Sequence, residues 1–164
     1  MKRLLTYILT ITATLLCVSC SAGKTELDYI ETYMNERPDS ALQVLQSIDI
    51  SSLTSNEVNH YHLLLAQAKD KCYIDETDDS IMLGVVDHYK SKSDFIKLFR
   101  AYYYLGRIQQ NVGRDTDAMY SYTEAEQLLD HISDDYTKGL LYAQMGALNH
   151  RSLDFNKALA AFNK

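Results

Sequence analysis

Proline, glycine, tryptophan and cysteine are all scarce in this 164-residue chain, which holds one Pro, six Gly, three Cys and no Trp. An all-β protein needs turn residues about every 8–12 positions, so the shortage of Pro and Gly excludes that class. It excludes collagen-like and low-complexity sequences as well. With 46% hydrophobic and 23% charged residues, the composition is that of a globular protein. We therefore expect a helix-rich domain.

Basic residues are also fewer than acidic ones. The chain has 16 Lys and Arg against 22 Asp and Glu, which gives a formal net charge of −6. An acidic chain does not readily neutralise phosphates, so we expect no nucleic-acid binding by this segment. The sequence has no Gly-rich phosphate loop and no Gly-x-Ser-x-Gly elbow, and its His and Cys residues lack metal-ligand spacing. We therefore expect no enzyme activity, no cofactor and no metal site.

The one long apolar run lies at the N-terminus. A cationic start, Met1-Lys2-Arg3, precedes an apolar stretch over 4–16 and a series of small residues over 18–23. This order is typical of a secretory signal peptide, and the apolar run is too short for a typical membrane span.

The end of this segment carries a more specific signal. Residues 16–20, Leu-Cys-Val-Ser-Cys, resemble the lipobox of bacterial lipoproteins, in which a small residue such as Ser19 precedes the modified cysteine. The resemblance implies a signal peptide over 1–19, an acylated Cys20 carrying palmitate-type chains, and a tether over 20–24. The alternative is an ordinary cleaved signal with an incidental cysteine. Lipidation would anchor the protein in the bacterial cell envelope, and we expect the outer membrane, facing the periplasm.

The rest of the chain repeats itself at a fixed spacing, the one that separates Tyr102 from Tyr142. When the chain is aligned with itself at this repeat offset, small and apolar positions match while the residues between them differ freely. This pattern indicates a packing constraint beneath a variable surface. The matched pairs are Tyr102 with Tyr142, Leu105 with Met145, Gly106 with Gly146, Ala118 with Ala158 and Tyr122 with Phe162.

The sequence of one repeat unit predicts a helix, a turn and a second helix. Apolar residues follow a helical period over 99–111, Gly113 begins a turn, and a second helical stripe includes Ala118 and Ala125. A glycine inside a helix costs about 1 kcal/mol relative to alanine. Gly106 therefore indicates a place where another helix comes too close for a side chain.

These residues resemble the tetratricopeptide repeat (TPR), whose pattern of about 34 residues combines an aromatic, Leu-Gly and Ala-x-x-x-aromatic. The resemblance implies an all-α fold, a right-handed α-solenoid of about four TPR-like hairpins over 25–164. Leu153 replaces the turn glycine of the last unit, so we expect a different turn there. The chain stops inside the second helix of that unit, and we expect it to be truncated. The packing residues that the resemblance implies are Tyr102, Leu105, Gly106, Ala118, Tyr122, Ala125, Tyr142, Gly146, Ala158 and Phe162.

In TPR proteins the first helix of each pair lines the concave surface. Arg100 and Arg107 share a helix face and could hold a carboxylate or an acidic peptide, or they could pair with neighbouring acids of the chain. Residues 102–104, three consecutive tyrosines, point about 100° apart, so we expect that they cannot all be core. The concave-face residues that the resemblance implies are Arg100, Tyr103, Arg107, Gln110, Asn111 and His150.

Together these features predict a non-catalytic scaffold that binds a protein or peptide and is tethered to the envelope by Cys20. Fold analogy carries the binding role. Two alternatives stay open: the sensor portion of a longer, membrane-linked transcriptional regulator, and an accessory lipoprotein of a nutrient-uptake system.

Overall fold

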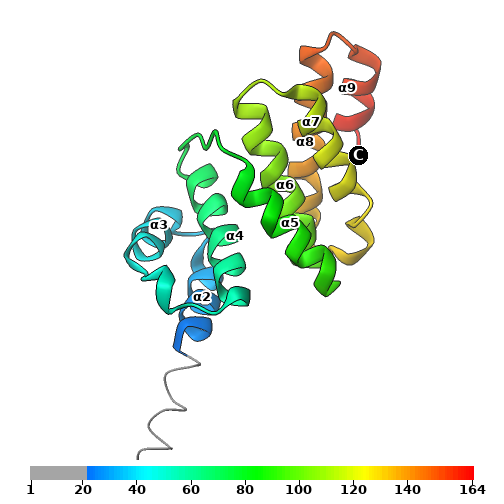
Figure 1. Cartoon of the computed structure of the whole chain (residues 1–164). Coiled ribbons are helices and arrows are strands. Elements are labelled where there is room, and N and C mark those ends of the chain that lie inside the picture. Colours follow the sequence, from blue (N-terminus) through cyan, green and yellow to red (C-terminus); the bar gives the residue numbers. More distant parts are fainter. Residues whose placement is uncertain (1–21) are drawn as a thin grey trace, which may run out of the picture.

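A computed structural model describes residues 22–164, with side chains from Glu26 onward except at position 155. The predicted signal peptide and Cys20 lie outside these residues. The described chain contains eight α-helices, two short 3-10 segments and no strand (Figure 1), which confirms the predicted all-α class. Within the same range, no helix combines the length and the apolarity that crossing a bilayer demands.

The helices follow one another as four packed pairs, and each pair also packs against the next. The first helix, α2, begins at Ala22, inside the segment that we expected to be a tether. The pairs are α2 (Ala22–Tyr33) with α3 (Pro38–Ser47), α4 (Ser55–Lys71) with α5 (Ser80–Lys92), α6 (Phe95–Asn111) with α7 (Asp115–Glu126), and α8 (Asp135–Arg151) with α9 (Phe155–Phe162).

The first helices of the last three pairs start one repeat offset apart, and each is 17 residues long. Thr54, Asp94 and Asp134 precede them, and each side chain accepts a hydrogen bond from a backbone N–H of the first turn. At α4, Glu57 also accepts from the Thr54 backbone, which completes a capping box. These caps satisfy N–H groups that have no partner inside a helix, so local sequence fixes where each helix begins.

The same three helices end in the same turn. Tyr73, Gly113 and Leu153, which the repeat offset also relates, have left-handed backbone angles with φ of 57°, 74° and 62°. The Leu153 N–H donates to the His150 carbonyl at 3.1 Å, as the Gly113 N–H donates to Gln110 at 3.1 Å. Our expectation of a different turn at Leu153 is therefore wrong. The hydrogen bonds of the Schellman turn hold the left-handed angle although the residue is not glycine.

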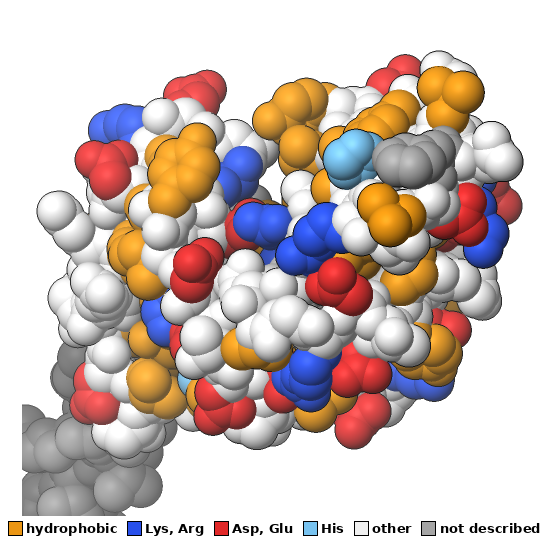
Figure 2. Space-filling model, turned by 90° about the horizontal axis from the view of Figure 1, so that it is seen from above, with side chains coloured by type: hydrophobic (Ala, Val, Ile, Leu, Met, Phe, Trp, Pro, Cys, Tyr) orange, Lys and Arg blue, Asp and Glu red, His pale blue; other side chains and the backbone are white. Residues whose placement is uncertain are grey.

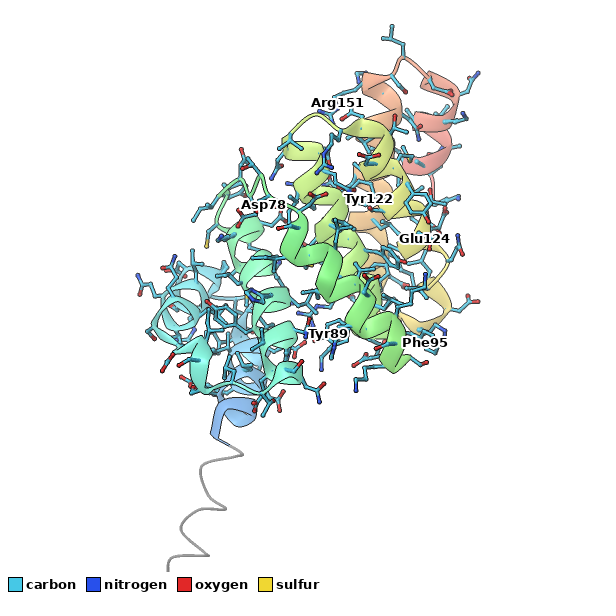
Figure 3. All side chains as sticks on the ribbon, viewed as in Figure 1. Asp78, Tyr89, Phe95, Tyr122, Glu124 and Arg151 are labelled. Atoms are coloured by element: carbon cyan, nitrogen blue, oxygen red, sulfur yellow. The ribbon has the colours of Figure 1, made fainter. Side chains whose placement is uncertain are left out.

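Two glycines inside helices lie beneath aromatic rings of the following helix. A Cβ added at Gly106 would come within 3.0 Å of three ring atoms of Tyr122, and one at Gly146 would meet the Phe162 ring in the same way. Figure 3 shows Tyr122 reaching from α7 toward α6. The close approach that the sequence indicated is thus made by a ring rather than by a backbone.

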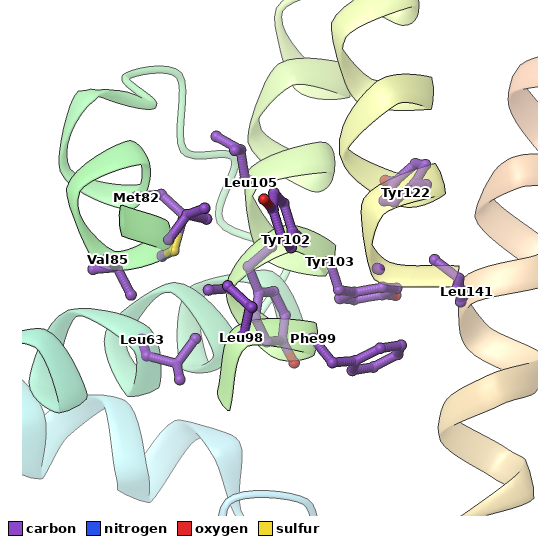
Figure 4. Close-up of a cluster of buried hydrophobic side chains, with 14 of the residues drawn as sticks. Leu63, Met82, Val85, Leu98, Phe99, Tyr102, Tyr103, Leu105, Tyr122 and Leu141 are labelled. Atoms are coloured by element: carbon purple, nitrogen blue, oxygen red, sulfur yellow. The ribbon is translucent and has the colours of Figure 1, made fainter. Parts of the chain in front are cut away.

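Two clusters of buried side chains form the core, and α4 contributes to both. The smaller one joins α2, α3 and one side of α4, with Leu27, Ile30 and Leu64 fully buried. The larger one brings together side chains from α4 to α8 (Figure 4), and Leu63 is the fully buried side chain that α4 contributes. Because α4 joins the two clusters, the first pair is coupled to the rest of the array.

The three consecutive tyrosines of α6, Tyr102, Tyr103 and Tyr104, all belong to the larger cluster. Each is only 7% exposed, so the expectation that they cannot all be core is wrong. Helix α6 packs against α4, α5 and α7. Neighbouring helices therefore cover most of each tyrosine side chain.

Candidate functional site

A groove of about 280 Å³ lies between the first helices of all four pairs. Residues far apart in the sequence meet along it, so it exists only when the pairs are packed. Its lining comes from α2 and its following turn (Glu31, Asn35), α4 (Gln67, Lys71), α6 (Ile96, Phe99, Arg100, Tyr103, Tyr104), the segment before α8 (His131, Ile132, Ser133, Asp134) and α8 (Tyr136, Thr137, Leu140).

The half of the groove formed by α6 and α8 is mostly apolar. Phe99, Tyr103 and Leu140 line it, and the first of these is 1% exposed. At the mouth, Ile96 is 56% and Tyr136 is 68% exposed. Burial raises the pKa of Tyr103 to about 12, so its hydroxyl stays protonated and can donate a hydrogen bond. An apolar wall with a few polar groups suits an apolar side chain of a ligand.

The half of the groove formed by α2 and α4 is polar and carries an ion pair. The Arg100 guanidinium donates to the Glu31 carboxylate and to the Gln67 side-chain oxygen. Burial alone would raise the pKa of Glu31, but its hydrogen bond with His60 and the charge of Arg100 lower it to about 2. The carboxylate is therefore ionised at neutral pH, and it links α2, α4 and α6.

His60 extends this pair into a cluster beside the groove. Its Nε2 lies 2.9 Å from Glu31 and its Nδ1 lies 3.8 Å from Asp28. One ligand atom from each of these three residues lies within 4.8 Å of the others, a spacing that could hold a metal ion. Because Arg100 already contacts Glu31, the arrangement is explained as an internal ion-paired cluster. In the sequence, the only sign of this cluster is the spacing of three between Asp28 and Glu31, because His60 lies on a different helix.

A second ion pair lies further along α6. The Arg107 Nε donates to the Asp70 carboxylate of α4 at 2.7 Å, and its Nη1 donates to Gln144 of α8 at 3.0 Å. Seen from above, Lys and Arg side chains gather near the middle of the molecule with Asp and Glu beside them (Figure 2). Both predicted arginines are thus held by neighbouring groups of the chain, one of the two alternatives that the sequence left open.

The predicted concave-face residues are divided between several places. Arg100 and Tyr103 line the groove. Arg107 and Asn111 line a recess of only about 10 Å³ beside it. The Gln110 side chain accepts a hydrogen bond from the Tyr122 hydroxyl at 2.8 Å. His150 is exposed and is not among the groove-lining residues.

The fourth pair contributes different residues from those we expected. The match to the repeat pointed to the later turns of α8, whereas the groove is lined by Tyr136, Thr137 and Leu140 in its first turns. The spacing of a repeat gives the face of a helix but not the angle at which neighbouring helices cross. That angle decides which turn reaches a shared groove.

Comparisons with protein-family models, curated proteins and solved structures gave no match for this chain.

Proposed function

We propose that the chain is a non-catalytic binding scaffold whose four helix pairs form a right-handed, TPR-like α-solenoid. Its ligand is a protein or peptide segment that lies in the groove. The observation that carries the proposal is the origin of the groove lining, because all four first helices contribute to it. In a stacked array of hairpins, such a shared surface is the one that repeat proteins use for extended ligands.

The repeat interpretation is supported by features that recur at the same repeat offset. They are the capped starts of α4, α6 and α8, the left-handed turns that follow them, and the contact of a mid-helix glycine with an aromatic ring. A repeat in which caps, turns and packing share one period is expected of a stacked array.

A binding role fits the chemistry of the groove better than catalysis does. Its charged residues Glu31 and Arg100 are joined to each other, and Asp134 accepts hydrogen bonds from backbone N–H groups at the start of α8. Catalytic acids and bases need access to a substrate. Here the apolar half, the exposed rim and the Lys71 side chain are the parts left open to a ligand.

The membrane attachment in this proposal is supported by the sequence of residues 1–20 alone. We expect Cys20 to be acylated and to hold the protein at the envelope, with α2 starting at Ala22 close to the anchor. The test is expression of the wild-type chain and of Cys20→Ser with an alkyne-labelled fatty acid. The wild-type chain should carry the label and be recovered in the membrane fraction, and the Cys20→Ser chain should do neither. A wild-type chain without label would contradict the anchor.

Binding is tested by selecting peptides from a random display library on the full 164-residue chain. Tyr136→Ala removes an exposed rim side chain of the groove, and Tyr120→Ala removes a tyrosine of similar exposure, 65%, on α7 away from it. We expect selected peptides to lose roughly ten-fold in affinity with Tyr136→Ala and to be unaffected by Tyr120→Ala. Equal effects of the two substitutions, or no selected peptide, would contradict the proposal.

A further inference from the structure

The charges that line the groove are neutralised within the chain with one exception. Glu31 and Arg100 pair with each other, and Asp134 caps α8 through the N–H groups of Tyr136 and Thr137. Lys71 also lines the groove, and its side chain makes neither a hydrogen bond nor an ion pair with the described residues.

The burial of Lys71 separates it from the other lysines without an ion pair. Lys90 and Lys92 also lack one, but they are exposed on α5, whereas Lys71 is half-buried at the groove. Lys71 lies in the last turn of α4, where the helix dipole favours a cation. That position explains a lysine but supplies no anionic partner for its ammonium group. An anion in the groove would supply that partner.

The groups around Lys71 indicate what kind of ligand would carry this anion. Asn35, exposed at the same end of the groove, adds a side-chain amide that can donate a hydrogen bond. The other end is the apolar half around Phe99 and Leu140. At about 280 Å³, the groove is near the lower limit of ligand sites and has room for one or two side chains.

We propose that the groove recognises a peptide in which an Asp or Glu side chain lies within one or two residues of a large apolar side chain. The carboxylate pairs with Lys71, and the apolar side chain packs against Phe99 and Leu140. This proposal rests on the proposed function and adds the chemistry of the ligand. The chain as a whole has a net charge of −6, so long-range attraction does not favour an acidic peptide and the preference depends on this contact.

The test uses an array of random heptapeptides, acetylated at the N-terminus and amidated at the C-terminus, probed with the full chain. The wild type should enrich Asp or Glu next to Leu, Ile or Phe. Lys71→Gln should weaken the best acidic peptides roughly ten-fold and remove the acidic preference. Lys71→Glu should replace it with a preference for Lys or Arg. Lys90→Gln and Lys90→Glu are the matched controls and should keep the wild-type preference.

The outcomes separate this inference from the proposed function. Peptides that bind and depend on Tyr136, but show no acidic preference or keep it in Lys71→Gln, would overturn the inference and leave the scaffold role intact. Binding restricted to a parallel array with free C-terminal carboxylates would also overturn it, because the anion would then be the chain end. If no peptide binds, both proposals fail. Circular dichroism and the melting temperature of each Lys71 variant show whether it has folded.

Discussion

The ring of Tyr122 lies over Gly106, and the space that a methyl group would need there is already filled by three of its atoms. Tyr122 is fully buried, and its hydroxyl donates to Gln110 on the same helix as the glycine. The pair therefore joins α6 to α7 by a close contact and by a hydrogen bond. The same glycine–aromatic contact returns one repeat offset later, at Gly146 and Phe162.

Gly106→Ala should destabilise the fold by about 1–3 kcal/mol, because the methyl group pushes a packed ring out of place. The result should appear as a lower midpoint of urea denaturation. Gly84→Ala on α5 is the control, since nothing lies within 4 Å of a Cβ at that position. There the gain in helix propensity should stabilise the protein by up to about 1 kcal/mol. A Gly106→Ala variant as stable as Gly84→Ala would show that the contact is unimportant.

Tyr122→Ala should lower the free energy of unfolding much more than Phe162→Ala, although the two residues occupy equivalent positions of the repeat. Tyr122 is fully buried, and Phe162 is 56% exposed at the end of α9. We expect a loss of roughly 3–5 kcal/mol for the first and roughly 1 kcal/mol for the second, because the gain from burial follows the apolar area removed from water. Urea denaturation of both variants measures the difference. Similar losses would mean that exposure does not set the contribution of this position.

Tyr73→Gly and Leu153→Gly should each stabilise the protein by about 1 kcal/mol. Both residues hold a left-handed backbone that is unfavourable for a side chain, and both are exposed, at 94% and 73%. Glycine removes the strain and little packing is lost. The reverse change, Gly113→Ala, should destabilise by a similar amount, and thermal melting measures all three. A lower melting temperature for the two glycine variants would contradict this interpretation of the turn.

The stability of the fold should fall as the pH is lowered from about 4.5 toward 2. Folding lowers the pKa of Glu31 from 4.5 to about 2. The unfolded carboxylate is therefore protonated first as the pH falls, and its contribution, fully present above pH 4.5, is lost progressively down to the folded pKa. We expect a loss of about 1–2 kcal/mol, less than the full shift implies, because a third of this side chain is exposed.

Urea denaturation at several pH values tests this expectation. Glu31→Gln should be less stable than the wild type at pH 7 and should show a flatter dependence between pH 4.5 and 2. Parallel pH profiles for the two proteins would show that the Glu31 cluster with His60 and Arg100 does not control acid stability.

Local sequence was enough to predict the helices and several packing contacts. The repetition of Gly106 and Gly146 indicated the period, and Gly113 marked the turn between α6 and α7. The same reasoning failed at Leu153, because a residue type alone does not reveal that the hydrogen bonds of the turn impose its backbone angle. It also failed for Tyr104, whose burial depends on helices that approach α6 from several sides.

The sequence by itself determined the all-α class and the repeat period, because caps and helical periodicity are properties of short segments. The anchor that we propose at Cys20 depends on the sequence alone. Only the tertiary structure decided that Glu31, Lys71, Phe99 and Tyr136 line one groove. The crossing angles of packed helices set which turns meet, and those angles arise from side chains that are distant along the chain.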